Sequence, residues 1–301
     1  MIESTRKYAL GVGAVLLSAT CFAGTSILFK VAYRIGLTPA MTLALQSWFS
    51  SVILIVYNAT FNRQVFRINR RMLPVLTFQG LVGTLGTSLI YAYALKYLPV
   101  SVAILLLYLY PSLVMAAEIL VWHRRVRVNQ IWALLLTLAG TLLASGILSG
   151  WGRVPVTGVI FGLGAAVCYA LFNLVGEVVV KRISPLAGMS FAQWFSSLGL
   201  IVYLGSNVVK LPWRDSQTWI IGLALATIAS IFPFYLVLVG IKLIGASRAA
   251  IMSTFELPMT FVMAALFLAE IPQWNQWAGG LLVLLGVAIL NWRTSDDGED
   301  T

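Results

Sequence analysis

The chain has 301 residues, of which 60% are hydrophobic and only 10% are charged. Soluble domains carry about 25% charged residues, so this composition excludes a soluble protein and indicates an integral membrane protein. The formal net charge of +10 could suit a nucleic-acid partner, but the basic residues lie in short loops between apolar segments. That distribution is typical of membrane orientation, so no nucleic-acid partner is predicted.

Ten apolar segments are long enough to cross a bilayer as helices, which takes about 20 residues each. Prolines and charged residues separate them, as in Thr38-Pro39 and Ser184-Pro185, and such residues favour breaks. Most loops are short, so consecutive helices are expected to be antiparallel neighbours in an all-α integral membrane protein. In chain order, the predicted transmembrane helices cover residues 8–33, 38–58, 73–96, 99–121, 129–149, 155–180, 186–208, 217–242, 246–269 and 274–292.

One stretch of the sequence occurs twice. Residues 46–57 read QSWFSSVILIVY and residues 192–203 read AQWFSSLGLIVY, with 8 identities in 12 positions at a spacing of 146. We therefore predict two copies of a five-helix unit, residues 1–150 and residues 151–301, the second ending in a short acidic tail. Because five is an odd number, the second copy should be inverted relative to the first. Inverted repeats in a membrane favour a transporter.

The distribution of Lys and Arg predicts the orientation. With the amino terminus inside, the inner loops and helix ends hold 14 of these residues and the outer ones hold 6. The positive-inside rule then places both termini in the cytoplasm, for a multi-pass protein of the cell inner membrane. Two inverted halves are expected to hold a substrate site near the midplane of the bilayer and to give alternating access to it.

Polar and aromatic side chains recur at steps of three or four along several predicted helices. Polar groups inside a bilayer are costly and indicate function, although tight packing of helices also uses small residues. We predict a cavity lined by the first, third, fourth, sixth, eighth and ninth helices. The candidate substrate-binding residues are Phe22, Thr25, Thr84, Ser88, Tyr91, Tyr108, Tyr169, Phe172, Asn173, Phe234, Ser253 and Glu256.

Glu256 is the most informative single residue. It lies about ten residues into the ninth predicted helix, hence about 15 Å deep. A carboxyl group at that depth could bind protons during transport or contact a substrate amine, so Glu256 is the candidate coupling residue. The alternative is a structural carboxyl group hydrogen-bonded across helices. Pro111 and Pro258 occupy related positions in the two copies and are predicted to kink their helices near the site.

Several other polar residues receive structural interpretations. Glu118 and Glu177 lie near inner helix ends and can reach Arg124 or Lys181, so we expect interfacial ion pairs. The repeated Trp48 and Trp194 are interpreted as part of a packing layer between the halves, with a gate as the alternative.

Motifs for enzymatic or ATP-driven chemistry are missing from the sequence. The only histidine, His123, lies in a basic loop, and no Cys/His metal-binding spacing, Ser-His-Asp set or phosphate-binding Gly-Lys loop is found. No metal, cofactor or enzymatic activity is predicted. A polytopic membrane enzyme remains a distant alternative, which would use carboxylates near one interface, and a passive channel is another.

The sequence resembles the drug/metabolite transporter superfamily in its ten-helix, EamA-type branch. The resemblance covers almost the whole chain and rests on LYLYPSLVMAAEIL at 107–120, TFELPMTFVMAALFLAE at 254–270 and GGLLVLLGVAIL at 279–290. The chain departs from the family pattern at Leu257, which separates a usually adjacent Glu and Pro, and at His123, where the first copy lacks its terminal Glu. The resemblance implies secondary transport of small organic metabolites, often export.

The predicted lining suggests the class of substrate. Tyrosines and phenylalanines around one deep carboxylate suit a neutral or zwitterionic solute, most simply an amino acid, and the aromatic amino-acid exporters of the superfamily are the closest analogue. Another small metabolite or a drug-like solute is the alternative. The expected partners are this small molecule, the lipid bilayer and, as coupling ions, protons.

Overall fold

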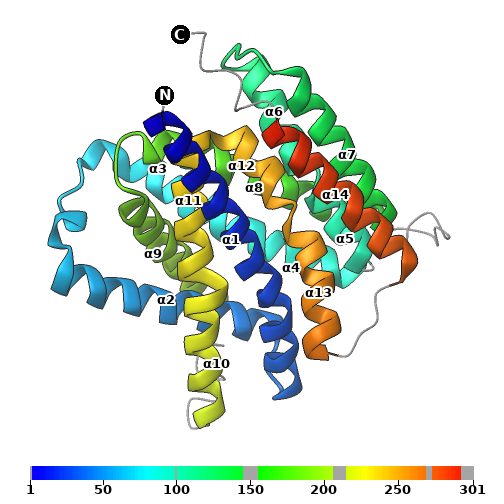
Figure 1. The fold of residues 1–301 in the computed structure, drawn as a ribbon. Coiled ribbons are helices and arrows are strands. Elements are labelled where there is room, and N and C mark those ends of the chain that lie inside the picture. Colours follow the sequence, from blue (N-terminus) through cyan, green and yellow to red (C-terminus); the bar gives the residue numbers. More distant parts are fainter. Residues whose placement is uncertain (1, 99, 145–154, 206–214, 269–272, 293–301) are drawn as a thin grey trace.

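The computed structural model describes residues 2–98, 100–144, 155–205, 215–268 and 273–292. In these ranges the chain forms helices joined by turns, without a β-strand (Figure 1). Eight helical segments are long and apolar enough to cross a membrane, and two shorter apolar helices, Val128–Ala144 and Trp274–Leu290, complete the set. The prediction of an all-α membrane protein with ten transmembrane helices is confirmed.

The first copy forms five transmembrane segments, two of which are interrupted. Its second segment starts at a capping residue: the Thr38 hydroxyl accepts a hydrogen bond from the Met41 amide, and Pro39 takes the first helical position, where its missing N–H costs little. The elements are α1 (Ile2–Arg34), α2 (Pro39–Phe61), α3 (Leu73–Phe78), the π-helical segment η3 (Gln79–Gly86), α4 (Thr87–Tyr97), α5 (Val100–Leu107), α6 (Tyr110–Leu120) and α7 (Val128–Ala144), with the 3₁₀ turns η1 (Arg63–Phe66) and η2 (Arg70–Met72) before α3.

The second copy repeats this plan. Its second segment again starts at a hydroxyl cap followed by proline, because Ser184 accepts from the Ala187 amide and Pro185 follows. The elements are α8 (Val156–Val180), α9 (Pro185–Leu204), α10 (Ser216–Ala226), the π-helical segment η6 (Thr227–Ile231), α11 (Phe232–Ile244), α12 (Ala246–Ser253), α13 (Glu256–Leu268) and α14 (Trp274–Trp292).

The same two segments are interrupted in both copies. The third and eighth segments each contain a π-helical stretch, η3 and η6. The fourth and ninth segments are each interrupted by a two-residue turn, which separates α5 from α6 at residues 108–109 and α12 from α13 at residues 254–255. Pro111 is the second residue of α6, and Pro258 is the third residue of α13, so each proline closely follows its interruption. The structure therefore repeats in its irregular features as well as in its sequence.

Equivalent helices of the two copies run antiparallel. A Cβ atom on Gly140 would lie 2.6 Å from the Gly279 carbonyl oxygen, and one on Gly286 would lie 2.8 Å from the Ala133 carbonyl oxygen. Higher residue numbers on α7 therefore lie beside lower residue numbers on α14, so the two helices are antiparallel. The two helices are equivalent, because each is the last helix of its copy. The second copy is therefore inverted, as predicted. The glycines allow a backbone approach that any side chain would prevent.

The repeated WFSS stretch lies where the two copies meet. Ser51 and Ser197 occupy equivalent positions, and their hydroxyl groups are 2.6 Å apart. Ser47 bonds the same Ser197 hydroxyl at 2.8 Å. Equivalent residues that contact each other must lie at the pseudo-two-fold axis, so α2 and α9 cross there. The predicted boundary of the copies at residue 150 and the acidic tail lie outside the described residues.

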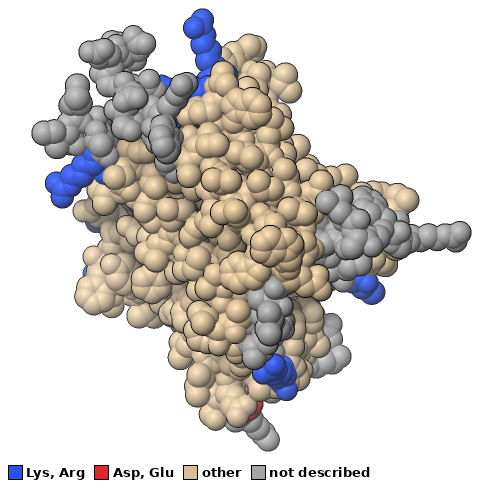
Figure 2. Space-filling model, turned by 45° about the vertical axis from the view of Figure 1, so that its right-hand side comes forward, with Lys and Arg blue, Asp and Glu red and all other residues tan. Residues whose placement is uncertain are grey.

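The two ends of the bundle differ in packing. The end where α1 begins and α14 ends is called the terminal end below (Figure 1). There the larger core joins Val15, Val180 and Ile244 with the apolar residues of α12. A smaller core, including Leu45 and Leu225, lies toward the opposite end. Figure 2 shows a broad uncharged face with Lys and Arg at its margins, as expected for a surface that meets lipid.

Candidate functional site

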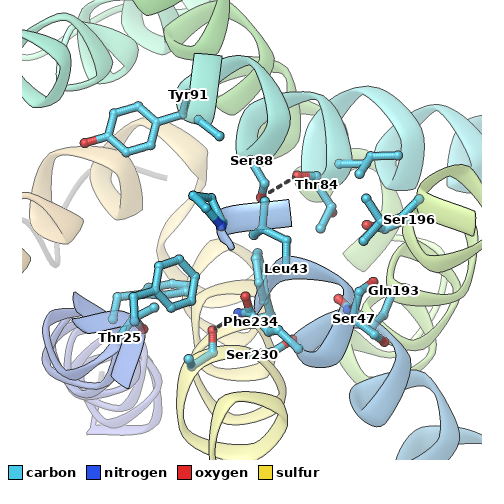
Figure 3. Close-up of a pocket in the computed structure, with 18 of the residues that line it drawn as sticks. Thr25, Leu43, Ser47, Thr84, Ser88, Tyr91, Gln193, Ser196, Ser230 and Phe234 are labelled. Atoms are coloured by element: carbon cyan, nitrogen blue, oxygen red, sulfur yellow. Dashed lines mark hydrogen bonds between the residues drawn. The ribbon is translucent and has the colours of Figure 1, made fainter. Parts of the chain in front are cut away.

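A cavity of about 270 Å³ lies between the two copies, toward the opposite end (Figure 3). Its walls come from α1, α2, η3 with α4, α9, and η6 with α11, so both copies contribute. Hydroxyl, amide and aromatic side chains dominate the lining, and none of the lining residues is charged. They are Phe22, Thr25, Phe29, Tyr33, Pro39, Leu43, Gln46, Ser47, Thr84, Leu85, Ser88, Tyr91, Ala92, Gln193, Ser196, Leu200, Ala229, Ser230 and Phe234.

Two glutamines hold the polar wall in place. The Gln193 side-chain amide donates to the Ser47 hydroxyl at 3.1 Å, which joins α9 to α2. The Gln46 amide donates to the Ala229 carbonyl oxygen at 2.8 Å, which joins α2 to η6. In this arrangement both amide groups are anchored through nitrogen, and each can offer its carbonyl oxygen to a ligand.

The π-helical segments explain how the wall is built. Pro233 has no N–H and cannot donate to the Ala229 carbonyl, so that carbonyl is available to Gln46 from the other copy. The Pro233 carbonyl in turn accepts from the Ser18 hydroxyl at 2.7 Å. On the other side, η3 carries Thr84 to the cavity. π-Helical turns are rare and are frequently found at functional sites, and here both of them lie against one cavity.

An aromatic row extends from the cavity into the core. The rings of Phe22 and Phe234 line the cavity and meet edge to face at 5.2 Å between centroids. Phe234 contacts Phe172 at 5.5 Å, and Phe172 stacks on Tyr169 at 6.0 Å. Tyr169 lies 4.3 Å from Tyr110. The row therefore connects the cavity wall to the packed terminal end.

The structure brings half of the predicted substrate-binding residues to this cavity: Phe22, Thr25, Thr84, Ser88, Tyr91 and Phe234. The other half, Tyr108, Tyr169, Phe172, Asn173, Ser253 and Glu256, is not part of its lining. Tyr108, Phe172 and Asn173 are buried in the core, and the Asn173 amide donates to the Tyr169 carbonyl oxygen of its own helix at 2.9 Å.

The predicted set of lining helices needs correction. The fourth, sixth and ninth segments do not line the cavity, and the second and seventh segments do. The reason is packing: Gly83 allows η3 to approach the Phe172 backbone, with a Cβ there only 3.1 Å from the Phe172 Cα atom. This contact closes the space between the third and sixth segments.

Glu256 lies just behind the cavity wall. It is the first residue of α13, after the break in the ninth segment. Its carboxylate is close enough to interact electrostatically with Tyr91, Tyr108, Tyr110 and Tyr169, of which Tyr91 lines the cavity. Within the described ranges Glu256 has no ion-pair partner. We call these four tyrosines the tyrosine cluster.

Sequence reasoning missed the polar residues of α2, α9 and η6 as cavity residues. Two signals were available: Gln46 and Gln193 are large polar groups inside predicted spans, and Pro233 releases a backbone carbonyl at the middle of the eighth segment. The missed residues are Gln46, Ser47, Gln193, Ser196 and Ser230.

An ionic cluster holds the terminal end together. The Arg124 guanidinium bonds Glu118 at 3.0 Å and Glu177 at 2.8 Å, and Lys181 bonds Glu177 at 2.6 Å. Glu177 also accepts from the backbone amide of Ala246, at the start of α12, at 3.3 Å. Hydrogen bonding to Glu177 raises the pKa of Arg124 further above its already high ordinary value. The predicted ion pairs are confirmed.

This pairing bears on the enzyme alternative. The two carboxylates near one interface, Glu118 and Glu177, are both engaged by Arg124 and are poorly placed to act as free acid and base. In the part of the chain that the structure describes, no group of three or more His, Cys, Asp and Glu side chains could hold a metal ion.

Comparison with known proteins places the chain among transporters. The sequence pattern of the EamA-like transporter family matches twice, at residues 9–146 and at residues 156–292. The chain is 24% identical over 283 residues to the uncharacterized transporter YcbK of Bacillus subtilis, covering 88% of this chain and 87% of that protein. It is 22% identical over 294 residues to the uncharacterized inner membrane transporter YicL of Salmonella typhimurium, covering 96% of each.

A solved crystal structure shares the fold. It superimposes with a TM-score of 0.78 at 18% sequence identity, covering 96% of this chain and 97% of the other. The double match to the family pattern agrees with the two inverted five-helix copies and with the cavity between them. This multi-pass membrane protein therefore belongs to the EamA-like transporter family.

Proposed function

We propose that the protein is a secondary transporter that moves a small neutral or zwitterionic metabolite across the cytoplasmic membrane by alternating access. The most favoured substrate is an amino acid, in particular one with an aromatic side chain, and the favoured direction is export. The observation that carries this proposal is the uncharged, aromatic-lined cavity between two inverted copies of one unit.

The chemistry of the lining supports a substrate without net charge. No Lys, Arg, Asp or Glu lines the cavity, and a net charge moved there from water would lose solvation without a counter-charge. Hydroxyl and amide groups can hydrogen-bond the polar end of a zwitterion. The volume of about 270 Å³ lies just below the range of roughly 300–1,000 Å³ for pockets that hold drug-sized ligands. The site suits a small metabolite.

The rings favour an apolar or aromatic side group. Phe22, Phe29, Tyr33, Tyr91 and Phe234 line the cavity. Offset or edge-to-face contacts between aromatic rings contribute about 0.5–1.5 kcal/mol beyond burial of their area. A phenyl, phenol or indole group could make such contacts with Phe22 and Phe234, which already meet edge to face at 5.2 Å. In Figure 3, Tyr91 lies on one side of the view, and Gln193 and Ser196 of the polar wall lie on the other.

The different packing of the two ends supports alternating access. The cavity reaches the end of α1 and the start of α2 at the opposite end, whereas the larger core and the ionic cluster close the terminal end. If the termini are cytoplasmic, as the positive-inside rule predicts, this state faces outward. Export is the direction that the superfamily resemblance implies.

Glu256 is the proposed coupling residue. It lies next to Tyr91, and within the described ranges no basic side chain neutralises it. A carboxyl group in such a site is costly to ionise and can exchange a proton when its surroundings change. Tyr91 is the member of the tyrosine cluster that connects Glu256 to the cavity, because it also lines the cavity wall.

Transport by purified protein in liposomes tests the proposal. A thermal-shift screen against amino acids and other metabolites first identifies ligands, because a ligand that binds the folded state raises its apparent stability. Efflux of radiolabelled Phe, Tyr, Trp and Thr is then measured against protein-free liposomes. Faster efflux of at least one of them from the proteoliposomes supports the proposal. If the protein transports none of the amino acids tested, the substrate assignment is wrong.

A further inference from the structure

A second cavity, separate from the central one, lies at the terminal end. Its volume is about 820 Å³, and three arginines line it: Arg67, Arg71 and Arg182. The loop between α2 and α3, with its turns η1 and η2, forms one wall, and the turn between α8 and α9 forms the other. The amide side chains of Asn62, Gln64 and Asn69 add hydrogen-bonding groups, and no acidic residue lines it.

The three guanidinium groups have no counter-charge within the described residues. Neither Arg67 nor Arg71 forms an ion pair or a side-chain hydrogen bond there. Arg182 contacts only the Met72 sulfur atom, at 3.8 Å, and a thioether is a weak acceptor. Arg124, in contrast, bonds two carboxylates at the same end of the molecule. The cavity thus collects positive charge that nothing on the described chain neutralises.

An apolar groove begins where this cavity ends. Trp48, Val52 and Ile55 of α2 face Trp194, Leu198 and Ile201 of α9 across it, and its volume is about 600 Å³. The side chains of Val52, Ile55 and Leu198 are exposed on the surface of the protein. Exposed apolar side chains on a membrane-spanning helix are expected to contact lipid.

The turn η1 joins the groove to the basic cavity. Val65 lines the basic cavity, while the next residue, Phe66, lines the groove and stacks on Trp194 at 5.5 Å with an interplanar angle of 6°. The turn η1 therefore separates the basic cavity on one side from the apolar groove on the other.

We propose that the basic cavity and the apolar groove together bind one anionic phospholipid from the leaflet at the terminal end. The phosphate group takes the place of the missing acidic partner of Arg67, Arg71 and Arg182. A guanidinium group can donate two parallel N–H hydrogen bonds to two oxygens of one phosphate group. An acyl chain lies along the groove between α2 and α9. Basic pockets beside apolar helix surfaces on the cytoplasmic side of a membrane suit such headgroups.

The positive-inside rule alone would also put arginines in these loops, so the test compares arginines that line the cavity with arginines that do not. Arg63, Arg70 and Arg125 are exposed basic residues at the same end and are absent from the cavity lining. The triple variant R67Q/R71Q/R182Q and the control R63Q/R70Q/R125Q remove equal charge. The single variant R71Q provides a milder change if the triple variant folds poorly.

Native mass spectrometry of the full-length protein in a neutral detergent gives the readout. Phosphatidylglycerol is titrated against phosphatidylcholine with the same acyl chains. We expect the wild type and the control to retain phosphatidylglycerol selectively, and R67Q/R71Q/R182Q to bind it at least about tenfold more weakly. R71Q should fall between them.

Two results would overturn the proposal. One is equal binding of the two lipids by the wild type, or an equal loss of binding in the cavity variant and the control. The other comes from inorganic phosphate: if it displaces phosphatidylglycerol at concentrations similar to the lipid's own, the cavity is an anion site and the groove holds no acyl chain. Displacement only at far higher phosphate concentration supports a lipid site.

Discussion

The terminal end and the opposite end of this transporter are both built from two copies of one unit, yet their packing differs. At the terminal end, Arg124 joins Glu118 to Glu177, and the apolar residues of α12 are packed into the larger core. At the opposite end, aromatic and hydroxyl side chains surround a cavity. A strictly symmetric dimer of the two copies would have no such difference, so it must arise from conformation, from sequence, or from both.

The register of the repeat separates these two causes. At the spacing of 146 that relates the two WFSS stretches, Ala264 takes the position of Glu118 in the second copy and Val31 takes the position of Glu177 in the first copy. The two carboxylates of the ionic cluster are therefore not repeated in this register, whereas the π-helical segments and the turns that interrupt the helices occur in both copies. Backbone symmetry permits the two ends to exchange roles, while the side chains make the two closures chemically different. In the proposed alternating-access cycle, opening the terminal end would separate the ions of the cluster, and closing the opposite end would bring the aromatic rings together.

Filling the cavity should have the largest effect. Ser230 lies on η6 and lines the cavity. We expect Ser230→Trp to lower the initial transport rate in proteoliposomes about 100-fold, since an indole group there would occupy the space that the substrate needs. Val202→Trp is the control, because Val202 is 83% exposed on the lipid-facing surface of α9. Wild-type rates in a folded Ser230→Trp protein would remove the cavity from the transport path.

Loss of the ionic cluster should shift the balance between the ends. The Arg124 side chain is 37% exposed, so its bonds are expected to contribute about 1–2 kcal/mol, less than a fully buried pair would. Arg124→Ala should then raise the population open at the terminal end roughly tenfold. The labelling rate of a cysteine introduced at the buried Val114, with both native cysteines replaced, measures that population.

Arg125 provides the matched control for this prediction. It is adjacent, equally charged and exposed. Arg125→Ala should leave the labelling rate unchanged. Equal acceleration in the two variants would mean that the loop's total charge, and not the ionic cluster, holds the terminal end closed.

The architecture could be predicted from the sequence because a bilayer imposes simple rules. Apolar length identified the ten helices, and the spacing of 146 between the two WFSS stretches identified the copies. The ion pairs of Glu118 and Glu177 were predictable as well, since charged groups near a membrane interface need partners within reach of their side chains. These inferences need only positions along the chain.

The cavity was only half predictable because it depends on which helix faces are turned toward each other. In lipid, apolar residues cover the outward faces and also fill the packed interior, so periodicity along one helix does not say which face meets the cavity. Asn173 and Thr84 look alike as polar residues in a span, but Gly83 packs η3 against Phe172 and leaves Asn173 in the core. The polar contacts of the π-helical segment η6 also depend on how helices pack, because Gln46 of the other copy donates to the Ala229 carbonyl oxygen, to which Pro233 cannot donate.

Glu256 tests whether proton binding accompanies exchange between the two ends. If it takes up a proton in the cycle, Glu256→Gln should abolish the effect of a pH gradient on transport, and the rate should fall severalfold to the level seen without a gradient. Asp215→Asn is the control, because Asp215 caps α10 outside the cavity and Asn is an equally good cap. A pH response that persists in Glu256→Gln would assign coupling elsewhere.

The smallest effect is expected at the pseudo-two-fold axis. Ser51→Ala removes the hydroxyl that lies 2.6 Å from Ser197, and such bonds in membrane proteins contribute about 0.6 kcal/mol on average. The thermal stability of the purified protein should fall slightly. The labelling rate at the terminal end should stay the same, because an interaction on the axis occupies an equivalent place whichever end is open and its loss weakens both states alike. A changed labelling rate would show that α2 and α9 move against each other during exchange, and that the axis takes part in the motion instead of serving as its pivot.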